Sequence, residues 1–213
     1  MRIITGKYKG RHFDIPRTFK ARPTTDFAKE NIFNVLTGYI DFEGTEALDL
    51  FAGTGSITLE LLSRGCTHVT SVELDRDHHR FICECVKKID NGQLMVDNCR
   101  IFRADAFRFI KSCKQQYDFI FADPPYALKE LPQIPDLVLG TSTHLSPLTT
   151  HLSPLTTHLS PLTTHHSPLT TPHSLLKPGG IFVFEHGKNN DFSQHPHFVE
   201  HREYGSVNFS IFQ

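Results

Sequence analysis

The sequence has no tryptophan, and none of its apolar runs approaches the roughly 20 residues needed to cross a bilayer. We therefore expect no transmembrane helix. The first residues, MRIITGKYKGRHF, are basic and contain no apolar stretch like that of a signal peptide, so export is not expected. The five cysteines form neither a CxxC pair nor an even set, which is typical of reduced thiols and predicts a cytoplasmic protein.

Neither sign of charge dominates, because the net charge of the 213 residues is −1. Residues 1–30 nevertheless carry eight basic and three acidic side chains, a balance of +5, so the rest of the chain carries −6. A basic arm on an acidic body indicates that one face meets an anionic partner. A hairpin whose charges only face solvent is the alternative, and it explains the charge equally well.

One segment, residues 143–170, consists of four tandem heptapeptides, three reading THLSPLT and one THHSPLT. Each unit contains a proline, which excludes a continuous helix and therefore a coiled coil. Two leucines in seven residues cannot bury a solenoid core. The histidines follow from the repetition and do not by themselves indicate a metal site. We expect a disordered heptapeptide-repeat insertion in a single domain formed by the rest of the chain.

Outside the repeat, short apolar runs alternate with amphipathic segments. Strands are expected at residues 46–51, 68–74, 99–104, 117–122 and 181–185, helices at 25–36, 56–64, 76–88 and 106–114, and a terminal hairpin at 197–203 and 207–212. The Lys-Pro-Gly-Gly sequence at 177–180 is expected to be the turn before the strand at 181–185. This order predicts an α/β fold with a doubly wound, mostly parallel sheet and a C-terminal antiparallel hairpin.

A glycine turn, DLFAGTG at 49–55, lies between the first expected strand and its helix. Such a turn lets a ligand approach backbone N–H groups at a helix N-terminus. A dinucleotide fingerprint would need a third glycine where this chain has Thr58, which disfavours a nucleotide-dependent oxidoreductase. Glu73 and Asp105 follow the next two strands, where acids accept ribose hydroxyls and a base edge. Either acid alone is more often a helix cap, but together they favour a nucleoside ligand.

The sequence Asp123-Pro124-Pro125-Tyr126 directly follows the strand expected at 117–122. Its prolines donate no N–H, so their carbonyls remain as acceptors. An exocyclic nucleobase amine is a poor nucleophile, because its lone pair is delocalised into the ring. Asp123 and the Pro124 carbonyl can each accept one N–H and turn that lone pair toward an electrophile, while Tyr126 stacks on the base. The alternative is a Pro-Pro loop that only ends a strand.

These two motifs together resemble the class I S-adenosylmethionine-dependent amino-methyltransferases. More narrowly, the chain resembles the 16S rRNA guanine-N2 methyltransferase family, RsmD, through MRIITG, RPTTD at 22–26, NIFNVL, LDLFAGTGS, FIFADPPY, the Glu185-His186 pair and YGS at 204–206. The resemblance implies a Rossmann-like fold and methylation of a guanine N2 amine in 16S rRNA. The partner would be that rRNA or the assembling small ribosomal subunit, and the enzyme a monomer without a membrane partner.

The resemblance also implies a role for each candidate residue. S-adenosylmethionine would be bound by Asp49, Phe51, Ala52, Gly53, Gly55, Glu73, Asp105 and Ala106. Catalysis would depend on Asp123, Pro124, Pro125 and Tyr126. No metal is implied, since a sulfonium is already an activated leaving group. The basic arm, residues 1–24, would contact rRNA phosphates through Arg2, Lys7, Arg11 and Arg22.

The chain departs from the family pattern in two places. The repeat stands where the family has a short helical connection, and the helix at 76–88 reads CECVKK where members often carry an asparagine. Two other functions remain as alternatives. An N6-adenine methyltransferase acting on RNA or DNA would use the same four residues, Asp123 to Tyr126. A non-catalytic RNA-binding relic is the second alternative, and the intact Asp-Pro-Pro-Tyr motif disfavours it. A protein glutamine methyltransferase typically has asparagine in place of Asp123.

Overall fold

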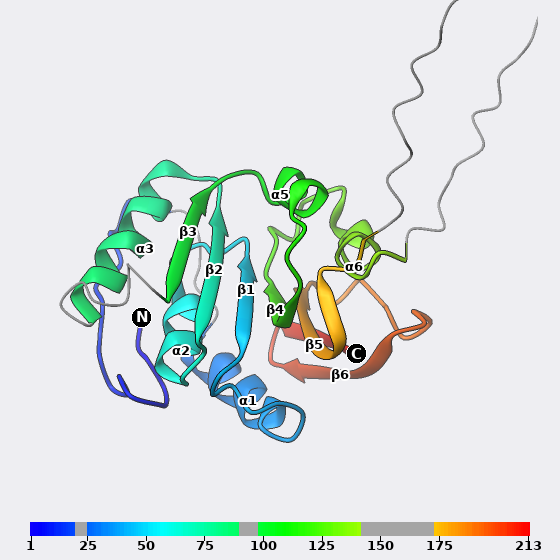
Figure 1. The fold of residues 1–213 in the computed structure, drawn as a ribbon, viewed down its shortest axis with the longest axis horizontal. Coiled ribbons are helices and arrows are strands. Elements are labelled where there is room, and N and C mark those ends of the chain that lie inside the picture. Colours follow the sequence, from blue (N-terminus) through cyan, green and yellow to red (C-terminus); the bar gives the residue numbers. More distant parts are fainter. Residues whose placement is uncertain (20–24, 90–97, 142–172) are drawn as a thin grey trace, which may run out of the picture.

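The computed structural model describes residues 1–19, 25–89, 98–141 and 173–213 (Figure 1). The elements, in chain order, are α1 (Asp26–Leu36), β1 (Glu46–Leu50), α2 (Ser56–Ser63), β2 (His68–Glu73), α3 (Arg76–Ile89), β3 (Cys99–Arg103), α5 (Ala106–Ser112), β4 (Tyr117–Ala122), the short 3-10 helix η1 (Leu131–Gln133), α6 (Ile134–Leu139), β5 (Leu176–His186), β6 (Phe198–Tyr204) and β7 (Val207–Phe212). The repeat at 143–170 and Arg22 lie outside these ranges. Within them, no helix has the length and apolar character needed to cross a membrane.

The strands form one seven-stranded sheet in the order β3-β2-β1-β4-β5-β7-β6. Strands β3, β2, β1, β4 and β5 are parallel, whereas β7 runs antiparallel to β5 and β6 antiparallel to β7. The predicted doubly wound α/β sheet with a terminal hairpin is therefore confirmed. The chain order reverses between β1 and β4, and in open sheets of this kind ligands bind beyond the carboxyl ends of the strands at that point.

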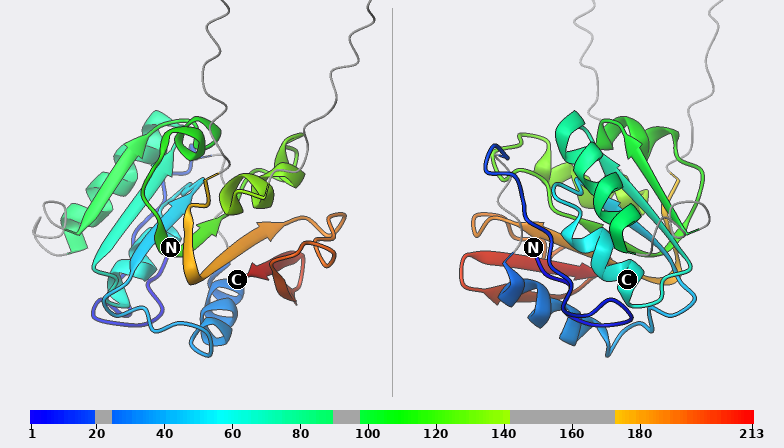
Figure 2. Two further views of the ribbon diagram at one scale, coloured as in Figure 1. Left: turned by 45° about the vertical axis from the view of Figure 1, so that its right-hand side comes forward. Right: turned by 90° about the vertical axis from the view of Figure 1, so that its left-hand side faces the viewer.

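Helices cover both faces of the sheet (Figure 2). Alternate residues of the buried strands supply the two cores, since successive side chains of a strand point to opposite faces. In β4, Phe119 and Phe121 pack with α1, α2 and α3, while Ile120 and Ala122 pack with α5 and α6. Burial on both faces explains why this strand reads as a continuous apolar run.

The prediction of a turn at 177–180 is wrong, because these residues belong to β5. In the pairing with β4, Leu176 lies opposite Tyr117 and Ile181 opposite Phe119, so β5 accommodates its extra residues as an irregularity. Gly179 adopts φ +78° within it. The Lys177 ammonium binds Glu46 at 2.8 Å and Asp118 at 2.9 Å, which holds this part of β5 against the starts of β1 and β4.

The chain leaves the described fold after Thr141 and returns at His173, and the two sides of this gap are in contact. The backbone N–H of Leu175 donates to the Val138 carbonyl at 2.8 Å. A side chain at Gly140 would come within 2.7 Å of the Ser174 nitrogen. Since β5 begins opposite the first residue of β4, this junction lies at the amino-terminal edge of the sheet.

Candidate functional site

A cavity of about 980 Å³ opens at the carboxyl ends of the central strands. It is lined by all four proposed catalytic residues and by seven of the eight proposed cofactor residues, namely Asp49, Phe51, Ala52, Gly53, Glu73, Asp105, Ala106, Asp123, Pro124, Pro125 and Tyr126. The glycine turn after β1 forms one side of the cavity, and the Asp-Pro-Pro-Tyr segment after β4 forms another. The fold thus brings together two motifs that are about 70 residues apart in the sequence.

Gly55 is the proposed cofactor residue that does not line the cavity. It precedes α2 with φ +75°, and a Cβ there would lie 2.9 Å from the Ile82 side chain of α3. Its small size therefore serves the packing of the turn against α3, whereas Gly53, with φ +54°, lines the cavity. Direct ligand contact remains a prediction for Gly53 and is not supported for Gly55.

Thr58 occupies the position at which a dinucleotide fingerprint has its third glycine. Its hydroxyl makes hydrogen bonds that a glycine could not make. It donates to Asp49 Oδ2 at 2.5 Å and lies 3.0 Å from the Ser71 hydroxyl, so it joins α2 to β1 and β2. Asp49 is buried, and burial raises the pKa of its carboxyl to about 7, with the Thr58 hydrogen bond acting in the opposite direction.

Glu73 supports the glycine turn from the neighbouring strand. Its Oε2 accepts a hydrogen bond from the Gly53 N–H at 2.7 Å, and its Oε1 accepts one from the Asp75 N–H at 2.7 Å. The carboxylate also lines the cavity. It therefore fixes the backbone that faces the ligand and offers its remaining lone pairs to the same space.

Asp105 acts as a helix cap, the structural alternative that its position in the sequence also allows. Its Oδ1 accepts the Arg108 N–H at 2.9 Å at the start of α5, and Ala106 begins that helix. Both residues line the cavity. Beside them, the rings of Phe51 and Phe107 meet edge to face at 6.0 Å between centroids and give this part of the wall an apolar surface.

At the Asp-Pro-Pro-Tyr side, the Tyr126 hydroxyl donates to Glu185 Oε1 at 2.9 Å. Burial, followed by the charge of Glu185, raises the pKa of Tyr126, so its hydroxyl remains a donor at neutral pH. Glu185 lines the cavity and is 4% exposed. Sequence reasoning names it only within a family motif. The signal that could have found it is an acid at the carboxyl end of a buried strand, as with Glu73.

The hairpin turn and the start of α1 also contribute to the cavity, a role that sequence reasoning does not assign to them. Ser206 and Val207 at the β6–β7 turn and Thr25, the N-cap of α1, belong to its lining. They are distant in sequence from the glycine turn and the Asp-Pro-Pro-Tyr segment, and the family motifs that contain Thr25 and Ser206 carry no site role by themselves. Among the described residues, no three His, Cys, Asp or Glu side chains gather as a metal site requires.

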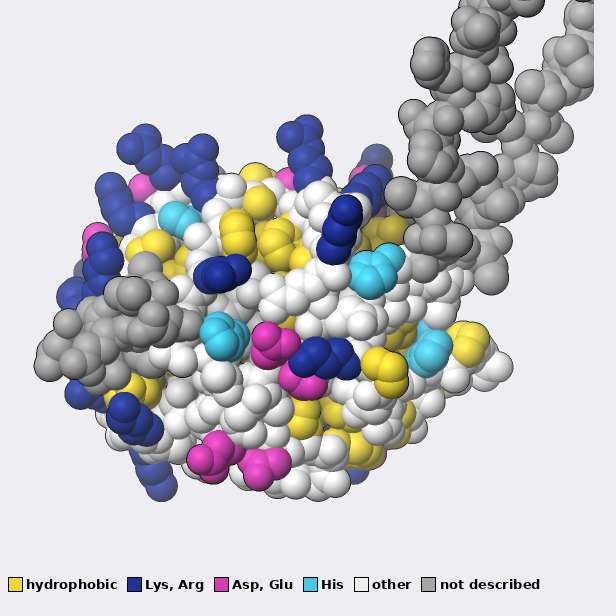
Figure 3. Space-filling view, in the orientation of Figure 1, with side chains coloured by type: hydrophobic (Ala, Val, Ile, Leu, Met, Phe, Trp, Pro, Cys, Tyr) yellow, Lys and Arg dark blue, Asp and Glu magenta, His cyan; other side chains and the backbone are white. Residues whose placement is uncertain are grey.

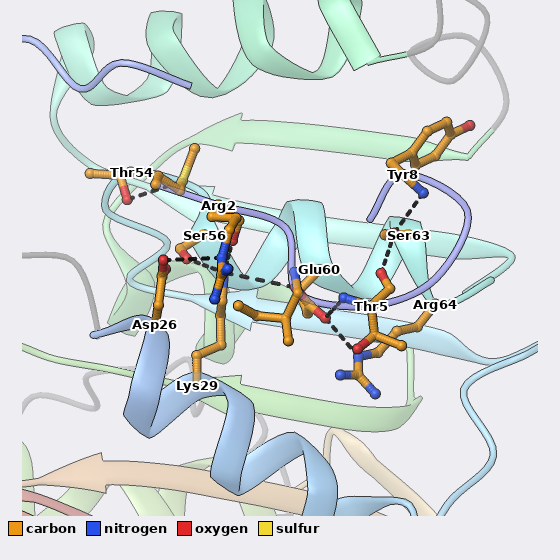
Figure 4. A network of polar contacts seen from close by, with 12 residues as sticks. Arg2, Thr5, Tyr8, Asp26, Lys29, Thr54, Ser56, Glu60, Ser63 and Arg64 are labelled. Atoms are coloured by element: carbon orange, nitrogen blue, oxygen red, sulfur yellow. Dashed lines mark hydrogen bonds and ion pairs between the residues drawn. The ribbon is translucent and has the colours of Figure 1, made fainter. Parts of the chain in front are cut away.

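A buried ion pair between α1 and α2 binds the backbone of the first residues of the chain (Figure 4). Lys29 of α1, 0% exposed, donates to the Arg2 carbonyl at 2.6 Å and to the Ser56 hydroxyl at 3.0 Å. Its ammonium lies 3.8 Å from Glu60, which also accepts from the backbone of Ile4 and from the Arg64 side chain. Burial lowers the pKa of Lys29, and this lysine is not part of a surface that could meet RNA.

Arg2, Lys7 and Arg11, the predicted RNA-binding residues within the described ranges, are not among the residues that line the cavity. Arg2 pairs with Asp26 at 3.5 Å, and the Arg11 guanidinium donates to the Lys88 carbonyl at 3.2 Å. Lys7 lies over the Tyr8 ring, 5.1 Å from its centroid. The contacts of Arg2 and Arg11 tie the N-terminal residues to α1 and α3. Contact of these residues with RNA phosphates stays a prediction.

Further basic side chains are spread along one margin of the face drawn in Figure 3. The edge strand β3 carries the exposed residues Arg100 and Arg103, and α5 carries the exposed residues Arg108 and Lys111. Sequence reasoning misses this group, because the acidic balance of residues 31–213 conceals it. Ala104, Asp105 and Phe107 line the cavity, so two members of this group, Arg103 and Arg108, directly adjoin lining residues in the sequence.

Comparisons with known proteins agree with this architecture. The family model described as conserved hypothetical protein 95 matches residues 1–149. YlbH from Bacillus subtilis is 36% identical over 141 residues, which cover 65% of this chain and 73% of YlbH. Ribosomal RNA small subunit methyltransferase D from Escherichia coli K12 is 33% identical over 126 residues, 59% of this chain and 60% of that protein. The match thus spans less than two thirds of the Escherichia coli sequence.

A solved structure extends the likeness of the fold beyond the matched sequence. A hypothetical protein of Thermus thermophilus superposes with a TM-score of 0.72 at 22% identity, covering 100% of this chain and 99% of that one. At this identity the likeness shows the fold alone. It includes the strands after the repeat, which the family model does not reach.

Proposed function

The chain belongs to the family described as conserved hypothetical protein 95, as its motifs indicated, and we propose that it is an S-adenosylmethionine-dependent methyltransferase acting on a guanine N2 amine of small-subunit rRNA. The observation that carries the proposal is the cavity shared by the glycine turn and the Asp-Pro-Pro-Tyr segment. The name of the Escherichia coli relative, Ribosomal RNA small subunit methyltransferase D, supports rRNA as the substrate class.

The glycine-turn side fits an adenosine-containing ligand by the chemistry of its groups. Glu73 would accept the ribose hydroxyls, Asp105 would receive the base edge, and Phe51 and Phe107 would flank the base with apolar surface. Gly53 allows the ligand to approach the backbone, because it has no side chain on the cavity side. A Cβ at this position would have the Phe51 carbonyl oxygen of its own turn as its nearest neighbour, at 3.9 Å, so it would occupy space that a ligand can use. When bound, S-adenosylmethionine supplies a methyl group on a positively charged sulfur, an electrophile that needs no metal.

The Asp-Pro-Pro-Tyr side would hold the target amine. Asp123 and the Pro124 carbonyl would each accept one N–H of the amine, which orients its lone pair toward the methyl group. Tyr126 is 45% exposed and presents a ring on which an extruded base can stack. Catalysis then comes mainly from holding two partners in reacting geometry, a contribution that can lower a barrier by several kcal/mol.

Basic residues of β3 and of the N-terminal residues 1–11 would meet the rRNA backbone. Arg100 and Arg103 belong to β3, and Arg103 directly precedes the lining residues Ala104 and Asp105. Arg2, Lys7 and Arg11 lie near the N-terminus. Such contacts strengthen binding without reading sequence, so the choice of base must come from the cavity. The substrate would be 16S rRNA, free or within an assembling subunit, and we propose that the protein acts as a monomer.

The test is methyl transfer with a chemically identified product. Purified protein, radiolabelled S-adenosylmethionine and either 16S rRNA or small subunits lacking the modification are incubated, and the digested nucleosides are analysed by mass spectrometry. N2-methylguanosine supports the proposal. N6-methyladenosine would replace it with the adenine alternative, and cofactor binding without transfer to either substrate would favour a non-catalytic role.

A further inference from the structure

Glu185 is a buried cavity residue that the proposed function does not use. It lies near the carboxyl end of β5, next to β4 in the sheet. Because Ala122 pairs with Phe184 in register, Asp123 and Glu185 are the next residues on two neighbouring parallel strands. Both line the cavity, so the residue proposed to hold the target amine has a second carboxyl group beside it.

The surrounding structure fixes the position of this carboxyl group. Tyr126 donates its hydroxyl to Glu185 Oε1, and Glu185 pairs in register with Phe209 of β7. The next residue, His186, is buried and bonds Ser210 of β7 through Nε2 at 2.9 Å. At Gly187 a Cβ would lie 3.5 Å from the Tyr126 ring, so the backbone passes close under that ring. A side chain held in this way can select between bases, because it cannot easily turn away from the wrong one.

The two purines with exocyclic amines differ at the atom next to that amine. In guanine, N1 carries a hydrogen beside the N2 amine, whereas in adenine N1 is an acceptor beside the N6 amine. A carboxylate accepts hydrogen bonds only, so it attracts the first arrangement and repels the second. This distinction does not depend on the amine itself, which both bases present to Asp123 and Pro124.

We propose that Glu185 determines base specificity by accepting the N1–H of the target guanine while Asp123 and Pro124 hold its N2 amine. The inference rests on the proposed function and deepens it. Tyr126 then has two roles, because its ring stacks on the base and its hydroxyl positions Glu185. An adenine in the same place would bring its N1 lone pair against the carboxylate, and a site that leaves buried polar groups mismatched rejects the wrong substrate strongly.

The probe is 2-aminopurine, which keeps the exocyclic amine of guanine but has an unprotonated N1. Fragments of 16S rRNA carry either guanine or 2-aminopurine at the target mapped by mass spectrometry. The wild-type protein should prefer guanine. Glu185→Gln, whose amide can donate to an unprotonated N1, should lower kcat/KM on guanine roughly 10- to 100-fold and reduce the preference over 2-aminopurine by at least about tenfold.

Two measurements separate specificity from a structural role. Affinity for S-adenosylmethionine, measured by calorimetry, should be unchanged in Glu185→Gln, and Glu203→Gln on the exposed side of β6 serves as the matched control. An unchanged preference, or lost cofactor affinity in Glu185→Gln, overturns the assignment of Glu185 while leaving the proposed function intact. Absence of any transfer to guanine by the wild-type protein overturns both.

Discussion

The two sides of the cavity are built differently. On the glycine-turn side, the Glu73 carboxylate bonds backbone N–H groups of its own chain, those of Gly53 and Asp75. On the opposite side, the Glu185 carboxyl bonds a side chain, the Tyr126 hydroxyl. A wall made of backbone groups that one carboxylate holds in place suits a ligand used by many enzymes. A wall made of side chains can be altered residue by residue, which suits the selection of one substrate.

The largest effect expected is on the side-chain wall. Asp123→Ala should reduce methyl transfer by about 100-fold or more, because it removes an acceptor that acts on the target amine in the transition state. Cofactor affinity should stay within a few-fold. Single-turnover kinetics and calorimetry measure the two quantities, with the exposed Asp77→Ala as control. Retention of more than about a tenth of wild-type turnover would remove Asp123 from the mechanism.

For the backbone wall we expect the opposite result: a mutation there should weaken cofactor binding and leave turnover largely unchanged. Glu73→Ala should raise the dissociation constant of S-adenosylmethionine roughly 10- to 100-fold, the effect of losing a hydrogen bond to a charged group. Turnover at saturating cofactor should be largely retained. Calorimetry and saturation kinetics check both parts, and exposed Glu84→Ala is the control. Unchanged affinity would mean that Glu73 only supports the turn.

The comparison can be extended to basic residues outside the cavity lining. Neutralising Arg100 and Arg103 together should weaken rRNA binding and flatten its dependence on salt, by about one unit of the log–log slope for each lost phosphate contact. Neutralising Arg11 and Arg22 tests the N-terminal arm in the same way. Filter binding at several salt concentrations gives the slopes. A pair whose removal leaves the slope unchanged does not contact phosphate.

A smaller effect concerns Asp49 beneath the glycine turn. Its pKa of about 7 in the folded protein lies above the unfolded value, so the folded state binds more protons and unfolding becomes easier as the pH rises toward and through 7. Between pH 6 and pH 8 this group should lower the free energy of unfolding by about 1.4 kcal/mol. Asp49→Asn can still accept from Thr58 and should lose that part of the pH dependence.

Urea unfolding of both proteins at the two pH values isolates the Asp49 contribution, since the histidines are the same in each. The difference between the wild-type and variant free energies should change by the amount stated. If the two proteins show the same pH dependence, Asp49 does not titrate in this range.

The smallest effect is expected from removing residues 143–170. The chain on either side of the gap is joined by the Leu175–Val138 hydrogen bond and by the close approach of Gly140 to Ser174. This junction lies at the amino-terminal edge of the sheet, whereas both cavity walls lie at the carboxyl edge. We propose that the insertion contributes to neither wall, so the deletion should keep turnover and Tm nearly unchanged. Thermal melting and the methyl-transfer assay check this, and a Tm lower by many degrees would contradict it.

The sequence alone determined the order of the strands, of helices α1, α2, α3 and α5, and the two motifs that face each other across the cavity, whereas η1 and α6 were not predicted. Apolar runs such as 117–122, the glycines at 53 and 55 and the prolines at 124 and 125 act through local backbone geometry, which neighbouring residues already specify. The terminal hairpin was predictable for the same reason.

Only the tertiary structure decided which polar residues are structural and which face the cavity. Lys29 looks like any basic residue of the N-terminal region until α1 packs it against Glu60 and Ser56, and Lys177 is bound within a strand that local pattern reads as a turn. Glu185 meets Tyr126 across 59 residues because β4 and β5 are neighbours in the sheet. Local pattern cannot encode such a contact, since it depends on strand order and register, which form only when distant segments pack together.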